Sequence, residues 1–175
     1  MIHGFVMSGM KYDFDFGGMT EDNSLFHIVN RIRKNSSVLE FGCANGRMTR
    51  YLKENLNCDV RAIEINADAA QHAASFAKEL LIADVEELSW LEHFDGYEFD
   101  YLTFADVLEH LKDPKIILSE AKKLLSSEGS ILISIPNIAH NSIIMNLIDD
   151  EFDYQEIGLL DKTHIRFFTY KSLLS

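Results

Sequence analysis

The sequence predicts an α/β fold, a doubly wound parallel sheet covered by helices on both faces. Short apolar runs suited to buried parallel strands alternate along the chain with segments of helical periodicity. The first of these runs, Val38 to Phe41, breaks at once into a turn punctuated by Gly42 and Gly46. Glycines at such a turn let the backbone approach a ligand where a Cβ would collide.

The order of the elements follows from the spacing of the apolar residues. Right-handed crossovers place the first strand centrally and give the strand order 3-2-1-4-5. Asp113 is placed to cap the fifth helix and Gly129 to end it. We expect helices near residues 21–34, 48–56, 67–78, 85–91, 114–128 and 143–147, strands near 38–41, 60–65, 80–82, 101–104 and 131–135, an extended piece at 165–168, and a last helix capped by Thr169.

Length and composition indicate one domain. The 175 residues are 47% hydrophobic and carry a formal net charge of −12, which argues against general nucleic-acid binding and against docking on anionic lipid. Two cysteines, and no pattern of a signal peptide or membrane span, favour a cytoplasmic protein. We expect an irregular arm at residues 1–20 and the domain at 21–175, with a homodimer through an uncovered sheet edge as an open possibility.

Acidic residues stand at the carboxyl ends of the first three predicted strands. Glu40 places a carboxylate beside the glycine turn, which suits a ligand with a cationic end better than a phosphate. Glu64 lies roughly twenty residues past that turn, where doubly wound proteins place an acid that binds ribose hydroxyls. Asp84 is placed to accept from an adenine amino group. For any one of these acids alone, an ordinary solvated loop carboxylate is the favoured interpretation. Their joint placement favours a nucleoside-type ligand.

Four segments resemble the motifs of class I S-adenosylmethionine-dependent methyltransferases. They occur in the family's order, and the likeness runs from about Leu25 to the end of the chain. The middle glycine of the family's first motif is Ala44 here. The segments are Val38 to Gly46, Ala62 to Ile65, Ala83 to Glu86 and Phe104 to Leu111.

The resemblance implies a Rossmann-like fold that binds S-adenosylmethionine, with S-adenosylhomocysteine as the product. The family's fold usually ends with an antiparallel strand pair, so we expect this chain to be truncated at its carboxyl end. The implied cofactor-binding residues are Glu40, Gly42, Cys43, Ala44, Gly46, Glu64, Ile65, Asp84, Val85, Ala105 and Asp106.

The resemblance also implies a methyl acceptor, a small molecule or a carbohydrate methylated on oxygen. The segment around His164 is similar to methyltransferases associated with glycosyltransferases. Asp106, His110 and His164 are the candidate catalytic residues, because a hydroxyl acceptor needs a general base. A structural role for either histidine, orienting or anchoring its loop, is the alternative interpretation.

Three other hypotheses stay open. Asp106, Glu109, His110 and His164 resemble in spacing the metal ligands of small-RNA terminal 2′-O-methyltransferases, although we expect no metal on balance. An NAD-dependent oxidoreductase of related fold would share the ribose-binding acid. A non-catalytic cofactor-binding domain would keep the pocket and lack the acceptor site.

Overall fold

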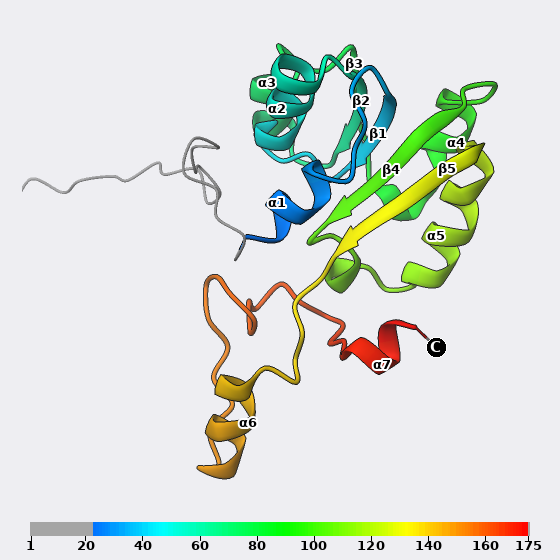
Figure 1. Cartoon of the computed structure of the whole chain (residues 1–175). Coiled ribbons are helices and arrows are strands. Elements are labelled where there is room, and N and C mark those ends of the chain that lie inside the picture. Colours follow the sequence, from blue (N-terminus) through cyan, green and yellow to red (C-terminus); the bar gives the residue numbers. More distant parts are fainter. Residues whose placement is uncertain (1–22, 175) are drawn as a thin grey trace, which may run out of the picture.

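The fold is taken from a computed structural model that describes residues 23–174, so the arm predicted for residues 1–20 lies outside the described residues. Five parallel strands form one sheet in the order β3-β2-β1-β4-β5 (Figure 1). This order confirms the predicted topology. The strands are β1 (Ser37–Phe41), β2 (Asp59–Glu64), β3 (Glu79–Ile82), β4 (Phe99–Ala105) and β5 (Leu125–Ser134).

Helices connect these strands and cover both faces of the sheet (Figure 1). Short 3₁₀ turns follow β3, β4 and α5. The helices are α1 (Ser24–Val29), α2 (Arg47–Leu56), α3 (Ala67–Ala73), α4 (Ser89–His93), α5 (Pro114–Ala121), α6 (Asn141–Ile148) and α7 (Tyr170–Leu173), and the 3₁₀ turns are η2 (Val85–Glu87), η3 (Leu108–His110) and η4 (Lys122–Leu124).

The two faces of β1 show how the core is divided. Val38 packs with apolar residues of α1 and α2, whereas Leu39 and Phe41 point to the opposite face, toward α4 and α5. Phe41 stacks on Phe104 with ring centroids 4.3 Å apart and meets the edge of Trp90 at 5.1 Å. Since both faces are apolar, β1 is buried on both sides, and its carboxyl end is held rigidly at the centre of the sheet.

The predicted bounds of four helices are wrong. The helix expected at residues 21–34 ends at Val29, and the one expected at 85–91 is divided into the 3₁₀ turn η2 and the helix α4. Gly129 does not end α5; it lies inside β5, next to the shift in β4–β5 register between Phe99 and Tyr101. A Cβ on Gly129 would stand 2.9 Å from the Phe99 carbonyl oxygen, so the glycine serves close strand packing at a bulge. The helix predicted to reach Lys78 stops at Ala73, because the Lys78 N–H donates to the Val60 carbonyl as the chain enters β3.

The chain after β5 leaves the sheet. Helix α6 stands apart from it, and the following segment returns past the carboxyl ends of the strands toward α7 (Figure 1). The predicted extended piece at 165–168 contributes a single bridge between Asn137 and Phe168. Thr169 caps α7 through its hydroxyl, as predicted. Among the helices of residues 23–174, none is long and apolar enough to cross a membrane.

Candidate functional site

The turn after β1 alternates residues of positive φ. Gly42, Ala44 and Gly46 have φ values of 69°, 48° and 81°. A Cβ on Gly42 would lie 2.7 Å from a methyl group of Val107, and one on Gly46 would lie 2.5 Å from the Cα of Ala73. The two glycines are therefore required by close packing, and Ala44 holds a strained conformation that glycine adopts freely.

Four backbone N–H groups of this turn, those of Gly42, Cys43, Ala44 and Gly46, donate within the protein. Those of Gly42 and Cys43 donate to the Ile63 carbonyl, at 2.8 and 3.3 Å, and that of Gly46 donates to the Cys43 carbonyl at 2.9 Å. The Ala44 N–H donates to the Glu64 carboxylate at 2.7 Å. A diphosphate cradle needs such groups directed at the ligand; here a carboxylate and two carbonyls take them.

Glu64, at the carboxyl end of β2, joins the glycine turn to the start of α3. One carboxylate oxygen accepts from Ala44, and the other accepts from the Asn66 N–H at 2.8 Å. The side chain is buried, with 7% of the residue exposed. A carboxylate has about four lone-pair sites, so after these two bonds it retains the capacity to accept from two ligand hydroxyls. The two hydrogen bonds also give Glu64 a structural role, beside the ribose-binding role predicted for it.

Glu40 lies under the glycine turn, buried within the sheet. Its carboxyl accepts a hydrogen bond from the Thr49 hydroxyl at 2.7 Å. Burial raises the pKa of Glu40 to about 8, the Thr49 bond opposes the rise, and the nearby charge of Glu64 adds to it. In the protein alone this carboxyl therefore holds its proton at neutral pH. A cation bound near it would favour the ionised form.

Thr49 was not among the residues predicted from the sequence. It is fully buried on α2, between the core residues Met48 and Leu52. A hydroxyl inside the apolar stripe of a helix is the signal that could have revealed it, because a buried hydroxyl requires a partner.

The remaining residues predicted to contact a cofactor lie at the same edge of the sheet. Asp84 is half-buried after β3, and its carboxylate accepts from the Glu86 N–H at 2.8 Å, capping η2. Val85 begins that turn, Ile65 is 65% exposed after β2, and Ala105 ends β4. The edge therefore presents acids from β1, β2 and β3 side by side, as the strand order requires.

Cys43 is buried in the glycine turn. Burial raises the pKa of its thiol far above the ordinary range, and the charges of Glu40 and Glu64 add to the effect. The thiolate is therefore scarce at neutral pH, and Cys43 acts here as a small core residue rather than a nucleophile.

Asp106 follows β4 with a φ of 54° and is exposed. Its carboxylate accepts from the Ser134 hydroxyl at 2.8 Å, and its N–H donates to the Ser134 carbonyl at 3.1 Å. These two bonds join the carboxyl ends of β4 and β5. Asp106 is thus fixed at the rim of the edge that carries the three acids.

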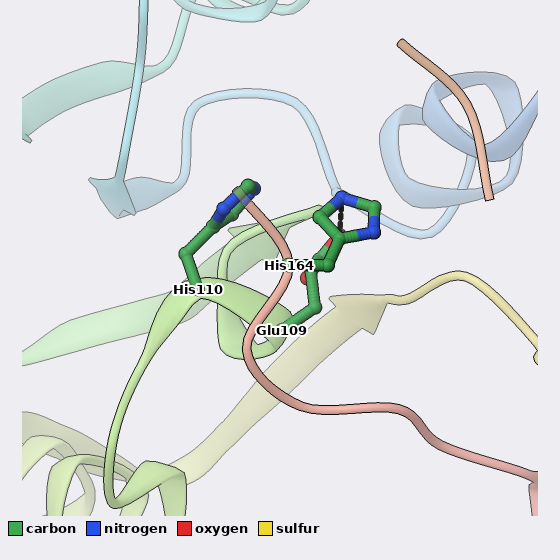
Figure 2. A group of neighbouring side chains, drawn as sticks. All are labelled: Glu109, His110 and His164. Carbon is green, nitrogen blue, oxygen red and sulfur yellow. Dashed lines mark ion pairs between the residues drawn. The ribbon is translucent and has the colours of Figure 1, made fainter. Parts of the chain in front are cut away.

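Three further side chains meet beyond Asp106; we name Glu109, His110 and His164 the histidine–glutamate cluster (Figure 2). Each offers one nitrogen or oxygen atom, and these atoms all lie within 4.8 Å of one another. His164 Nε2 is 3.8 Å from a Glu109 carboxylate oxygen, and the two imidazole rings meet edge to face with centroids 4.9 Å apart. Asp106, which the resemblance to small-RNA terminal 2′-O-methyltransferases groups with them, is not in this group of atoms.

The cluster joins η3 to the returning segment 159–166. The Glu109 carbonyl accepts from the N–H groups of Ile165 and Arg166, at 2.9 and 3.0 Å. The turn before His164 is stabilised by the buried Asp161, whose carboxylate accepts from the N–H and hydroxyl of Thr163 at 2.9 and 2.7 Å. Residues more than fifty positions apart are therefore held together by backbone hydrogen bonds as well as by their side chains.

The Glu109 carboxylate is in an unusual environment. The residue is 1% exposed, and within residues 23–174 neither carboxylate oxygen has a hydrogen-bond partner. Burial raises the pKa of Glu109 to about 8, with the charges of Asp106 and Asp161 adding to the rise. A buried carboxylate without partners is costly to ionise, so this side chain can hold a proton or a cation.

The sequence of this chain is similar to those of known methyltransferases. A family profile described as "Methyltransferase domain" matches residues 20–175. The ubiquinone biosynthesis O-methyltransferase of Glaesserella parasuis serovar 5 (strain SH0165) is 29% identical over 122 residues, which are 66% of this chain and 51% of that protein. The chain spans about half the length of the curated relatives it matches.

Solved structures share the fold. A SAM dependent methyltransferase from Archaeoglobus fulgidus superposes with a TM-score of 0.65 at 19% identity, over 86% of this chain and 62% of that chain. The plantazolicin methyltransferase BpumL, solved in complex with SAH, superposes with a TM-score of 0.64 at 19% identity, over 86% of this chain and 57% of that chain. At these identities the likeness establishes the architecture.

Proposed function

The chain belongs to the methyltransferase domain family, and we propose that it transfers a methyl group from S-adenosylmethionine to an oxygen atom of a small-molecule acceptor. The observation that carries the proposal is the glycine turn after β1, which is backed by two buried carboxylates and has four of its N–H groups occupied within the protein. A ligand with a nucleoside and a cationic end suits this edge; a diphosphate does not.

Three acids would bind the donor. Glu64 retains lone pairs for the ribose hydroxyls, and Asp84 stands one strand further out, where the adenine would lie. The glycine turn and Glu40 would face the methionine part, with Ala105 and Asp106 near the reacting carbon. S-adenosylmethionine, when bound, supplies a methyl group already activated by its sulfonium. The protein's contribution is to align the acceptor oxygen with that carbon.

The acceptor side contains groups that can take a proton. His110 is half-buried, and its Nδ1 lies 3.1 Å from the Thr163 carbonyl, which places a proton on Nδ1 and leaves Nε2 as the basic nitrogen. His164 and Asp106 are the other candidates for the general base. The O-methyltransferase name of the curated relatives favours oxygen as the acceptor atom, and a carbohydrate acceptor remains the alternative within this proposal.

Calorimetric titration with S-adenosylhomocysteine and, separately, with NAD tests the donor site. We expect saturable binding of the first and none of the second. Binding of NAD in place of S-adenosylhomocysteine would contradict the proposal and favour an oxidoreductase. Glu64→Ala should weaken binding by about 1–3 kcal/mol, as for a lost hydrogen bond to a charged group.

The exposed Glu54→Ala is the matched control for this titration, since Glu54 lies on α2 and pairs with Arg50 in solvent. Because Glu64 also holds the glycine turn, circular dichroism of the Glu64 variant must show that the fold is retained. An unchanged affinity in a folded Glu64→Ala protein would mean that the ribose binds elsewhere.

Methyl transfer itself is tested with isotope-labelled S-adenosylmethionine against a panel of phenolic and carbohydrate acceptors. Labelled product from the phenols supports a small aromatic acceptor, and labelled product from the sugars supports the alternative. Binding of S-adenosylhomocysteine without transfer to any acceptor would favour a non-catalytic cofactor-binding domain.

A further inference from the structure

We propose that the histidine–glutamate cluster is a binding site for one divalent metal ion of the Zn²⁺, Co²⁺ or Mn²⁺ class. The site is formed by Glu109 and His110 from η3 and by His164 from the returning segment (Figure 2). The inference rests on the geometry of these three side chains; only the ion's role in the reaction rests on the proposed function.

The chemistry of the three side chains selects the type of ion. Two imidazoles and one carboxylate suit zinc and neighbouring transition metals, whereas magnesium and calcium prefer oxygen ligands alone. On a tetrahedral zinc ion with bonds of about 2.1 Å, two ligand atoms lie about 3.4 Å apart. The 3.8 Å between His164 Nε2 and the Glu109 oxygen must contract by about 0.4 Å to reach that value, and the 4.8 Å within which all three ligand atoms lie by about 1.4 Å at most.

Both histidines are oriented by backbone carbonyls. His164 Nδ1 lies 3.2 Å from the Leu159 carbonyl, and His110 Nδ1 lies 3.1 Å from the Thr163 carbonyl. Each contact places a proton on Nδ1, so the lone pair of each ring is on Nε2. Metal-binding histidines ordinarily donate their second N–H to a carbonyl or carboxylate in this way, which fixes the tautomer needed for coordination.

The buried carboxylate of Glu109 is a second observation that supports a cation site. Its carboxylate is almost fully buried, neither oxygen has a hydrogen-bond partner within residues 23–174, and its single ion-pair partner there is His164. The fold therefore directs an unsatisfied acidic group at two imidazole nitrogens. A cation between them would satisfy both oxygens and offset the cost of burying the charge.

Three protein ligands leave coordination positions open. Asp106 is joined to Ser134 and is not within the cluster, so water or an acceptor hydroxyl would fill the open positions. Under the proposed function, the ion would hold the acceptor oxygen and lower the pKa of its hydroxyl, a Lewis-acid role. With the Nε2 atoms of His110 and His164 bound to the ion, Asp106 is the remaining candidate for the general base. The three-residue set differs from the four-residue set that the resemblance to small-RNA terminal 2′-O-methyltransferases offered as an alternative.

The test is metal binding by the protein without cofactor or acceptor. Protein freed of metal with EDTA is titrated with Zn²⁺ by calorimetry and with Co²⁺ by visible absorption. We expect one ion per chain, together with the d–d bands of cobalt bound to nitrogen and oxygen. Glu109→Gln, His164→Asn and His110→Ala should each weaken binding at least about tenfold.

Two further variants serve as controls. His72→Ala removes an exposed histidine of α3 and should leave metal binding unchanged. Asp106→Asn should also retain it; a loss as large as that of Glu109→Gln would overturn the three-residue assignment. Zn²⁺ should raise the melting temperature of the parent protein and not that of Glu109→Gln, whose own melting temperature shows whether it folds.

No saturable binding of Zn²⁺ or Co²⁺, or stoichiometric binding that survives Glu109→Gln unchanged, would overturn the proposal. Titration of the same samples with S-adenosylhomocysteine separates the two proposals. A protein that binds the nucleoside and no metal would refute the ion alone, and one that binds metal and no nucleoside would refute the proposed donor site alone.

Discussion

Replacing Glu40 by glutamine should remove a large part of the pH dependence of this protein's stability. The carboxyl is buried under the glycine turn, and its pKa is raised from an ordinary 4.5 to about 8, chiefly by burial. The folded protein therefore binds a proton at Glu40 between these two pH values that the unfolded chain has released. The stability contribution of this proton is complete below pH 4.5 and is lost as the pH rises toward 8.

The magnitude follows from linkage. Each unit of pKa difference corresponds to about 1.36 kcal/mol, so the free energy of unfolding should fall by roughly 3 kcal/mol between pH 5 and pH 8 through Glu40 alone. Glutamine has nearly the same shape, stays neutral at every pH, and its carbonyl can still accept from the Thr49 hydroxyl. The variant should match the parent near pH 5 and be more stable than the parent near pH 8.

Urea unfolding followed by circular dichroism at several pH values measures this difference. Glu109, whose pKa is raised to about 8 for the same reason, contributes equally to both proteins and cancels in the comparison. Glu128→Gln, at an exposed position of β5, is the control that should change nothing. If Glu40→Gln and the parent lose stability in parallel from pH 5 to pH 8, the carboxyl is not desolvated and the reasoning fails.

The other predictions concern the glycine turn and its support. Gly46→Ala should lower the free energy of unfolding by about 3 kcal/mol, since its Cβ would strike the backbone of α3; Gly96→Ala, with similar φ and open space, should cost only about 1 kcal/mol. Ala44→Gly should stabilise the protein by up to about 1 kcal/mol in urea unfolding, by relieving a φ of 48°. Thr49→Val should raise the pKa of Glu40 further, because the Thr49 bond lowers it, and carbon NMR of the glutamate carboxyls would detect the shift.

Local sequence patterns predicted the strand order correctly. They failed where the conformation of a residue depends on contacts with residues distant in the sequence. Apolar runs and the handedness of crossovers were enough to order the strands and to place Glu40, Glu64 and Asp84 at one edge. Gly129 was misplaced because a glycine after a helical pattern ordinarily ends the helix, whereas here the packing against Phe99 uses it inside a strand. That contact joins two elements and leaves no local signal.

In the histidine–glutamate cluster, too, the sequence indicated some of the residues but not the contacts that bring them together. The resemblance to small-RNA terminal 2′-O-methyltransferases grouped Asp106 with Glu109, His110 and His164, but the Ser134 hydroxyl and carbonyl hold Asp106 at the end of β5. The meeting of His164 with Glu109 depends on two backbone bonds to the Glu109 carbonyl, and sequence cannot reveal these. Nor can it reveal that the Glu109 oxygens are left unsatisfied, since this depends on every neighbour at once.

The buried acids differ in how completely the protein itself satisfies them. Glu64 accepts from two backbone N–H groups, Glu40 accepts from one hydroxyl, and the Glu109 carboxylate accepts from no described residue. Folding alone selects against buried acids without partners, because each reduces stability and a neutral residue of similar shape would not. Ligands that bind the folded protein can offset this cost. S-adenosylhomocysteine should therefore stabilise the protein through the edge that holds Glu40 and Glu64, and Zn²⁺ through Glu109. If the two sites are independent, the increases in unfolding free energy measured with each ligand alone should add when both are present.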